Sequence, residues 1–448
     1  MAEAAVAAAR AFWEEVYKRF DPEEPARRHE WRAERPWSPR ADILRGLDLP
    51  FGEPRRYLFF GTTGTGKSTE LLAIAEEQTH KRMVVLFDVH RHFAESVRDP
   101  AALQHVQPWE VILLVGMAVY KAAAESFGST WTTQSIQPMA QAIHSFATDL
   151  QGQSDRPAVD LGKLAGTLAV LAGGAVGGPV GASLALLKPV VDTVRWNFTL
   201  GRRKDRPTDQ DPRVVDLQNA VNALIGTVQK EHHDLVLVVD GLDRIAESET
   251  TRNLFVESAL LASLGCRTIV AGPVLLWTGS LAAQVRGFYP KILANAPVLD
   301  ETHPAQPGQG IAFLLDLYER RVRDLEGAAM DEKHLRKLAY YSGGRSRDFV
   351  RFLRMVAERA WEGAVTRSTD ELIDLCIDER RRTLELGLHS GHIDLLRRVA
   401  DDPRHRLPDD GQTAFLLDQQ LLLPYPNESE WYFPHPLLTL KLVPLTTG

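Results

Sequence analysis

The stretch Tyr57-Leu-Phe-Phe-Gly-Thr-Thr-Gly-Thr-Gly-Lys-Ser-Thr69 decides the fold. Its four apolar or aromatic residues predict a buried strand, and the Gly-x-x-x-x-Gly-Lys-Ser pattern that follows them is complete. The glycines Gly61, Gly64 and Gly66 let the backbone curl, so that successive N–H groups point inward and form a nest for phosphate oxygens. The helix-forming run Glu70–Glu77 comes next, and its N-terminus adds the positive end of a helix dipole. The stretch predicts a strand, a phosphate-binding loop and a helix.

The residue types in this loop predict nucleotide binding. Lys67 carries a positive charge for the β- and γ-phosphates, and the Ser68 hydroxyl can bind Mg²⁺. We expect ATP or ADP with Mg²⁺, rather than an incidental glycine-rich turn. The residues expected to contact the nucleotide are Gly61, Thr62, Thr63, Gly64, Thr65, Gly66, Lys67, Ser68 and Thr69.

A second nucleotide signature lies further along the chain. The apolar run Leu235–Val239 predicts a buried parallel strand that ends in Asp240. In a doubly wound sheet, a carboxylate at this end of a strand lies near the phosphate loop and holds Mg²⁺ directly or through water. Asp243 follows after three residues, and we expect it to orient the attacking water. A plain turn is the alternative, which the phosphate loop disfavours.

The order of motifs predicts an α/β fold with several parts. The chain between Lys67 and Asp240 is much longer than the roughly 30 residues of a βαβ unit. We therefore expect a P-loop parallel-sheet core at 46–90 and 213–300, with a strand at Met83–Val89 and a large insertion at 91–212. A helix at Thr251–Leu264 and strands at Arg267–Ala271 and Ala296–Leu299 should complete the core.

The segments outside this core are expected to be mainly helical. Apolar residues recur at three- and four-residue spacing after Pro304, which predicts a helical lid over 301–370. Helices followed by a hairpin at Pro426-Asn-Glu-Ser429 predict a winged-helix domain over 371–448. The remaining part, 1–45, is expected to be an N-terminal helical segment.

Composition limits the cell compartment and the partners. The 448 residues carry a net charge of −7 and only two cysteines, Cys266 and Cys376, which fit buried thiols in a reducing compartment. The N-terminus has no secretory signal pattern, so we expect a cytoplasmic protein. From Gly387 to Gly448 there are five Lys/Arg and eight Asp/Glu, a balance that disfavours DNA binding by the winged helix.

Taken together, the motifs resemble the STAND branch of AAA+-like ATPases, which includes the nucleotide-binding cores of NLR-type immune proteins. The origin-recognition AAA+ proteins, which also end in a winged helix, are a related group. The resemblance covers about 40–90 and 213–448. It implies an ATPase that acts as an ATP/ADP conformational switch, with self-association and a separate effector or partner protein, in bacterial defence or signalling.

The resemblance also implies roles for two residues outside the loop. Arg347, in Tyr341-Ser-Gly-Gly-Arg-Ser-Arg-Asp348, resembles a sensor-2 arginine that reaches the γ-phosphate; Arg345 is its rival, and a solvated basic helix face is the plain alternative. His435 matches the histidine that contacts the ADP β-phosphate in the closed STAND state, although Pro436 replaces the usual aspartate. A helix-capping histidine is the alternative for His435.

The chain departs from the AAA+ pattern at two places. Ala271 and Gly272 stand where a polar sensor-1 residue is usual, and Gly241 stands where Glu usually follows the Walker B aspartate. Both changes imply slow hydrolysis, which suits a switch.

The insertion contains a long uncharged run, Leu164–Leu187, whose length would span a bilayer. The break at Gly177-Gly-Pro179 favours a soluble segment instead. A membrane-targeted ATPase and a DNA-associated AAA+ regulator of replication or transposition type therefore remain the less favoured alternatives.

Overall fold

The computed structural model describes residues 2–97, 99–127, 137–143, 145, 208–232, 234–277, 281–408, 410–426 and 431–443. The uncharged run Leu164–Leu187 and the tip of the expected hairpin lie outside this part. Within it, no helix is long and apolar enough to cross a membrane. The chain forms two compact units: a sheet unit of residues 40–60 and 71–291, and a lid unit of residues 1–39, 61–70 and 292–448.

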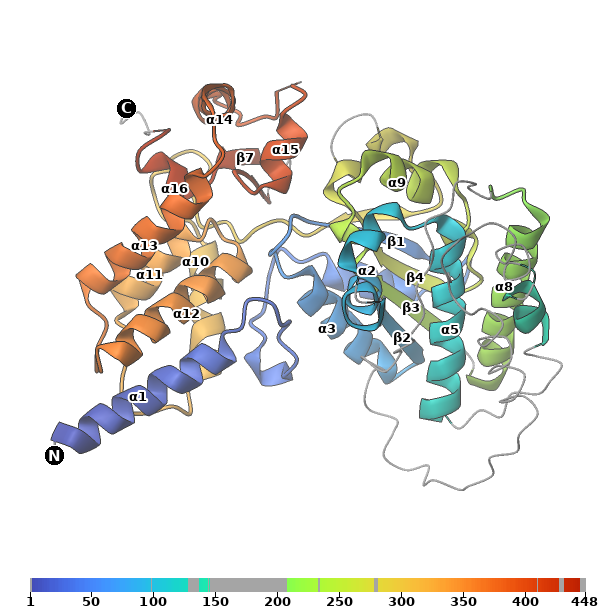
Figure 1. Ribbon diagram of the computed structural model, residues 1–448, viewed down its shortest axis with the longest axis horizontal. Helices are drawn as coiled ribbons and strands as arrows, with labels where there is room; N and C mark the ends of the chain where they lie inside the picture. The colour runs from blue at the N-terminus through green and yellow to red at the C-terminus, as the bar shows by residue number, and fades with distance from the viewer. Residues whose placement is uncertain are drawn as a thin grey trace, which may run out of the picture. The chain divides into compact units, whose positions relative to one another are not determined.

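The sheet unit contains a five-stranded sheet (Figure 1). Its strands are β1 (Arg56–Phe60), β2 (Met83–Asp88), β3 (Leu235–Asp240), β4 (Arg267–Ala271) and β5 (Tyr289–Ile292). The spatial order is β2-β3-β4-β1-β5, and the pairs β2–β3, β3–β4 and β4–β1 are parallel. All residues of β3 are buried, as expected for a central parallel strand. The predicted α/β fold with a parallel P-loop core is confirmed.

Helices cover this sheet, and one of them lies in the segment expected to be an insertion. The helices are α2 (Arg40–Leu47), α3 (Lys67–Thr79), α4 (Val89–Arg91), α5 (Pro108–Phe127), α8 (Pro212–His232) and α9 (Ser248–Arg252). Helices α5 and α8 pack against each other, α5 also contacts β2, and α8 contacts β3 (Figure 1). Most of α5 is fully buried, so the first part of 91–212 contributes to the hydrophobic core of the sheet unit.

One helix expected in the sheet unit is not continuous. The run Thr251–Leu264 was expected to be a single helix, but α9 continues only as a short π-helix at Asn253–Glu257, and a separate 3₁₀ turn follows at Leu261–Ser263. Between these two segments, a side chain accepts a hydrogen bond from the backbone: the Asp209 carboxylate accepts from Ala259 N at 2.7 Å. Polar side chains that bond backbone N–H groups compete in this way with helical hydrogen bonds.

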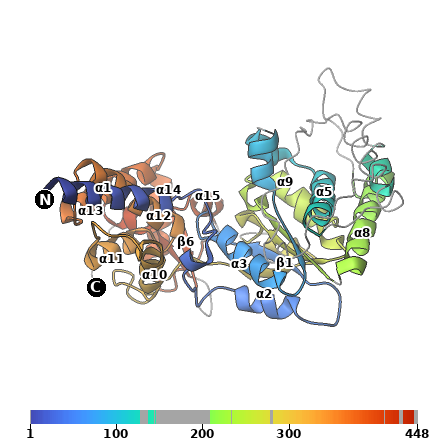
Figure 2. The same cartoon turned by 90° about the horizontal axis from the view of Figure 1, so that it is seen from below.

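The lid unit is mostly helical (Figure 2). Its elements are α1 (Ala2–Arg19), α10 (Gly310–Val322), α11 (Glu332–Tyr341), α12 (Ser346–Glu362), α13 (Asp370–Glu385), α14 (Ser390–Asp401), α15 (Thr413–Asp418), β6 (Leu422–Tyr425), β7 (Trp431–Pro434) and α16 (Pro436–Thr439). Strands β6 and β7 form an antiparallel hairpin after α14 and α15. The predicted lid helices and the helix–helix–hairpin order of a winged helix are confirmed.

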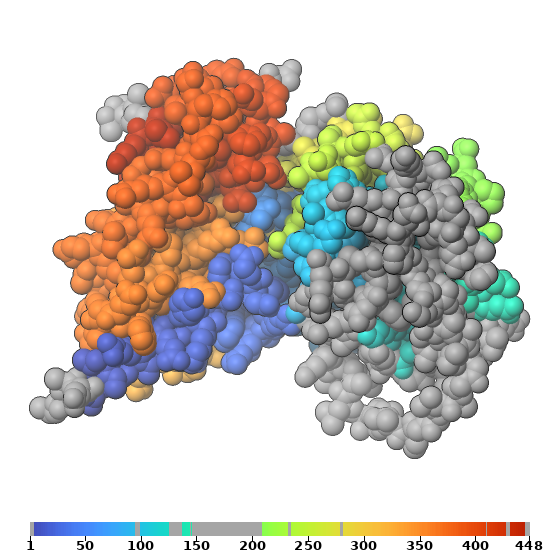
Figure 3. All heavy atoms as spheres, viewed as in Figure 1, coloured from blue at the N-terminus to red at the C-terminus, as the bar shows by residue number. Residues whose placement is uncertain are grey.

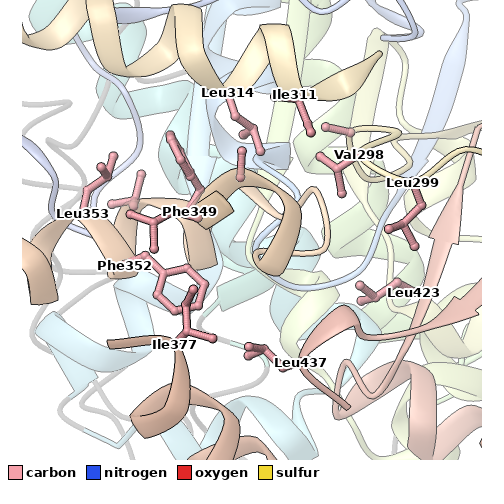
Figure 4. Close-up of a cluster of buried hydrophobic side chains, with 14 of the residues drawn as sticks. Val298, Leu299, Ile311, Leu314, Phe349, Phe352, Leu353, Ile377, Leu423 and Leu437 are labelled. Atoms are coloured by element: carbon pink, nitrogen blue, oxygen red, sulfur yellow. The ribbon is translucent and has the colours of Figure 1, made fainter. Parts of the chain in front are cut away.

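The lid helices and the winged helix share one hydrophobic core. In Figure 4, Leu423 of β6 and Leu437 of α16 lie in the same cluster as Phe352 of α12 and Ile377 of α13. On the surface, the lid in orange and the winged helix in red form one continuous body (Figure 3). Helix α1 packs along α12 and adds Trp13 to the same core.

The strand expected at Ala296–Leu299 is not present. This segment forms only an isolated bridge from Leu299 to Pro307, and Tyr289–Ile292 supplies the fifth strand instead. Pro297 has no N–H group to donate, and Ala296 N is bonded to Gly344 O at 2.9 Å. The segment is therefore held by a turn of the lid unit rather than by a neighbouring strand.

Both cysteines are buried free thiols, as the sequence predicts. Burial raises the pKa of Cys266 to about 12 and that of Cys376 to about 11.

Candidate nucleotide-binding site

The loop at 61–70 has the backbone shape of a phosphate nest. Gly64 and Gly66 have φ of +89° and +99°, a region that glycine enters without steric cost. A Cβ at Gly64 would also lie 2.8 Å from Arg345 Nη2, so a side chain has no room there. Inside the loop, Thr65 N and Oγ1 both donate to Thr62 O, at 3.3 and 3.0 Å. The sequence prediction of a curled loop agrees with this geometry.

Lys67 is folded onto its own loop. Its Nζ donates to Gly61 O at 2.7 Å and to Thr62 O at 3.2 Å, and the residue is only 5 % exposed. These two carbonyl groups accept hydrogen bonds from the buried ammonium group. A phosphate at the loop would compete with two charge-assisted hydrogen bonds, which are the stronger kind.

The loop residues fit a nucleotide with its metal. Gly64 and Gly66 are half-buried, and so is Ser68 in the first turn of α3. The buried Thr62 Oγ1 has no hydrogen-bond partner among the described residues, and Thr69 Oγ1 accepts only a long bond, 3.3 Å, from Ala26 N. A hydroxyl and a carboxylate are oxygen ligands of the kind that Mg²⁺ prefers, and the assignment of Ser68 and Asp240 as its ligands stays a prediction.

The lid unit places an arginine on the loop, and it is Arg345. Its Nη2 donates to Thr63 O at 2.7 Å, and the side chain is fully buried. The side chain of Arg347 points elsewhere: Nε donates to Pro22 O at 3.0 Å, while its backbone N bonds Gly64 O at 3.1 Å. Both residues therefore contact the chain at the loop or beside it, but only the guanidinium of Arg345 bonds the loop directly.

Asp348 forms ion pairs with Arg345 and with two further arginines. Its carboxylate accepts from Arg345 Nη1, from Arg380 Nη2 at 3.1 Å and from Arg351 Nη1 at 3.5 Å, and it is 1 % exposed. Burial alone would raise the pKa of Asp348, but the Arg345 charge, together with His435 and Arg380, holds it well below its usual range. Burial also lowers the pKa of Arg345 to about 10. The cluster is a buried ion pair with two further arginines at its edge.

His435 joins the same cluster and also caps a helix. Its Nδ1 accepts from Leu437 N at 3.2 Å, at the start of α16. A ring nitrogen that accepts carries no proton, so the neutral ring has its proton on Nε2, which lies 3.6 Å from Asp348 Oδ2. Burial lowers the pKa of His435, which favours this neutral form. Among the groups described, the chain from Thr63 O through Arg345 and Asp348 to His435 connects the phosphate loop with the winged helix.

The second signature lies at the carboxyl edge of the sheet. Asp240 is the last residue of β3 and is 6 % exposed, and its Oδ1 accepts from Gly241 N at 2.8 Å. Asp243 follows on a short turn, Leu242–Arg244, and is half-buried. Strand β1 ends at the same edge of the parallel sheet, and the phosphate loop starts at the next residue, Gly61.

Asp88 is a residue at this edge that the sequence prediction missed. It ends β2 and is the register partner of Asp240. Burial raises the pKa of Asp88, and the nearby Asp243 carboxylate adds to the rise. The only signal in the sequence is an aspartate at the end of an apolar run, the same signal that identified Asp240; the prediction treated Met83–Val89 as a plain strand.

Gly272, the residue after β4, stands where a polar side chain is usual, and the packing around it explains why it is a glycine. A Cβ at Gly272 would lie 2.8 Å from Phe60 Cε1 and 2.9 Å from Leu58 Cδ1, and Gly272 N bonds Phe59 O at 3.0 Å. The aromatic packing on β1 leaves no space for a side chain at this position.

Comparisons with known proteins identify remote structural likenesses. No family model and no curated protein matches the chain. Among solved structures, it is similar to Drosophila ORC bound to DNA, at 9 % identity and a TM-score of 0.38, covering 95 % of this chain and 89 % of that one. It is also similar to Cdc6p from Pyrobaculum aerophilum, at 13 % identity and a TM-score of 0.36, covering 95 % and 96 %. A third is the Aeropyrum pernix ORC1 protein in complex with DNA, at 11 % and 0.37, covering 95 % and 94 %.

Proposed function

We propose that this chain is an ATP- and ADP-binding P-loop ATPase of the AAA+ kind that works as a conformational switch. The observation that carries the proposal is the connection from the phosphate loop to the winged helix. Arg345 bonds Thr63 O in the loop and shares the buried Asp348 with His435. A change in the loop on nucleotide binding therefore acts on a charge cluster that also holds the C-terminal segment.

Each residue of the predicted nucleotide site would have its own role. Lys67 would exchange the carbonyls of Gly61 and Thr62 for phosphate oxygens. Mg²⁺, held by Ser68 and Asp240, would neutralise phosphate charge. The Arg345 guanidinium bonds the loop, whereas Arg347 meets it through its backbone N, so one of the two guanidinium groups would have to turn toward the γ-phosphate to bind it in bidentate fashion. His435 would stabilise the ADP-bound closed form, through an ADP phosphate or through Asp348.

The differential binding free energy that switching requires is of the size that these contacts contribute. Moving a two-state equilibrium from 1:99 to 99:1 takes about 5.5 kcal/mol of differential affinity. A hydrogen bond to a charged group contributes about 1.5–3 kcal/mol, so two to four such bonds that differ between ADP and ATP are enough.

The first test is nucleotide binding by calorimetry. Lys67→Ala should abolish binding of ATP and ADP, whereas Lys81→Ala, an exposed lysine that pairs with Asp48, should bind like the wild type. Unchanged affinity in Lys67→Ala would refute the nucleotide site. Asp240→Ala should remove the Mg²⁺-dependent part of binding.

The second test separates the two arginines and the histidine. If Arg345 senses the γ-phosphate, Arg345→Lys should lower affinity for an ATP analogue more than for ADP, and Arg347→Lys should not; the opposite order would assign the role to Arg347. His435→Ala should weaken ADP about tenfold to a hundredfold and leave ATP nearly unchanged. Equal ADP affinities would make His435 a helix cap only.

The state of assembly follows from the switch. We expect the ADP form to be closed and the ATP form to self-associate and to bind a separate effector protein, in a defence or signalling setting. Gel filtration in ADP and in an ATP analogue measures this directly. Identical elution in both nucleotides, at concentrations above their Kd, would contradict the switch.

A DNA-associated role is the second candidate. Two of the similar structures were determined with DNA. In this chain four exposed arginines, Arg397, Arg398, Arg404 and Arg406, lie on α14 and the turn after it, but Arg398 pairs with Asp410 at 2.7 Å. DNA binding that weakens steeply with salt and is lost on changing these arginines to alanine would favour this candidate.

A further inference from the structure

Two carboxylates meet at Gly241. Asp88 and Asp240 are register partners at the ends of β2 and β3. Gly241 has φ of +87°, and a Cβ built on it would lie 2.6 Å from Asp88 Oδ1 and 2.5 Å from His90 N. Any side chain at position 241 would therefore collide with the Asp88 carboxylate or with the backbone beside it. The Asp88 carboxylate occupies the space that a glutamate after Asp240 would need.

We propose that Asp88 is the group that positions and deprotonates the attacking water in ATP hydrolysis. The carboxylate that AAA+ enzymes supply from the residue after the Walker B aspartate would here come from the neighbouring strand. This inference rests on the proposed ATPase function, and it names a catalytic residue for that reaction.

The chemical step balances without a further reactant. The water oxygen forms a bond to the γ-phosphorus, and the bond from the γ-phosphorus to the β–γ bridging oxygen breaks with its electron pair left on ADP. One water proton passes to the Asp88 carboxylate, which later returns it to solvent. Lys67 would balance the charge that collects on the leaving oxygen, and Mg²⁺, with Ser68 and Asp240 as its predicted ligands, would supply further positive charge there.

The position of Asp88 favours it over Asp243 for this step. Asp88 lies at the end of a strand directly beside β3, at the edge where β1 enters the phosphate loop. Asp243 comes after Gly241, on the turn that leads away from β3. The charged groups around Asp88 are His90, Asp243 and Arg244.

Asp88 also caps a helix, and the experiment has to distinguish this structural role from the proposed catalytic role. Its Oδ1 accepts from Arg91 N at 2.9 Å and caps α4. A carboxylate has two oxygens and can accept about four hydrogen bonds, so the cap does not exhaust it. Asparagine caps helices as well as aspartate does, so Asp88→Asn keeps the cap and removes the base.

The experiment is single-turnover ATP hydrolysis together with ATP affinity. Asp88→Asn should lower the rate about 10²–10⁴-fold, the usual contribution of a general base, with ATP Kd within about threefold of wild type. The matched control is Asp99→Asn, because Asp99 caps another turn of the sheet unit by accepting from Ala102 N at 3.3 Å. That control should hydrolyse ATP at the wild-type rate.

The outcomes distinguish this inference from the proposed function. Wild-type hydrolysis in Asp88→Asn, with hydrolysis abolished in Lys67→Ala, would overturn the role of Asp88 alone. A loss in Asp243→Asn but not in Asp88→Asn would assign the water to Asp243. Wild-type hydrolysis in Lys67→Ala would instead overturn the ATPase site. Should Asp88→Asn fail to fold by circular dichroism, Asp88→Ser, whose hydroxyl also caps, takes its place, with the same expected loss.

Discussion

Breaking the Arg345–Asp348 pair should destabilise α12 unequally, depending on which partner is removed. Asp348→Leu leaves Arg345, a fully buried guanidinium, without its carboxylate. Removing one partner of a buried pair costs about 3–5 kcal/mol, because the other charge stays buried and unpaired. Arg345→Met should cost less, about 1–3 kcal/mol, because Asp348 keeps Arg380 at 3.1 Å and Arg351 at 3.5 Å.

The assay is hydrogen exchange of peptides from α12, which reports the opening free energy of that segment separately from the sheet unit. A loss of 3–5 kcal/mol corresponds to roughly two to four decades faster exchange, at about 1.4 kcal/mol per decade. The double variant should exchange more slowly than the two single effects predict when added, because neither charge is then stranded. Equal effects of the two single variants, or simple additivity in the double variant, would refute this account of the cluster.

Three further predictions follow from buried groups. Because the pKa of Asp348 lies below its unfolded-state value of about 3.9, the stability it contributes is present above that pH and lost as the pH falls toward the folded pKa; acid unfolding of Asp348→Asn should lack this component. Gly272→Ser should destabilise the protein by about 1–3 kcal/mol in urea unfolding, through overpacking against Phe60, and should not speed hydrolysis. Cys266 and Cys376 should resist alkylation at pH 8 until the protein unfolds, since burial raises both pKa values; rapid labelling of the native protein would contradict their burial.

The sequence predicts those parts of the fold that local patterns determine. The phosphate loop, the strand ending in Asp240 and the helices from Gly310 onward follow from glycine spacing, apolar runs and helical periodicity, and all are present. The helix expected at Thr251–Leu264 stops after Glu257, and the distant Asp209 accepts from Ala259 N just beyond it. The strand expected at Ala296–Leu299 is absent, and Ala296 N bonds Gly344 O in a lid turn instead. Both failures come from tertiary contacts that local periodicity does not contain.

Local sequence patterns also do not determine which side chains meet in the candidate site. Arg345 and Arg347 are two residues apart at one helix start, and Arg345 pairs with Asp348. The other partners of Asp348 include Arg380 and His435, which come from two distant places in the chain. Asp88 was missed because its neighbour is set by strand order: β2 lies beside β3, far from it in sequence. Residue type indicated the chemistry, and only the register shows which carboxylates stand together.

The core that the winged helix shares with the lid sets a free-energy cost on any separation of the two. Separating the two would bring Leu423, Phe433 and Leu437, each at most 1 % exposed, into contact with water. Burial of such side chains is worth about 1.5–3 kcal/mol each, so roughly 4.5–9 kcal/mol would be lost, which is comparable with the about 5.5 kcal/mol that inverts a two-state equilibrium. If the proposed switch opens between the winged helix and the lid, a second molecule that covers these apolar side chains would lower this cost, and opening would then depend on protein concentration as well as on the nucleotide.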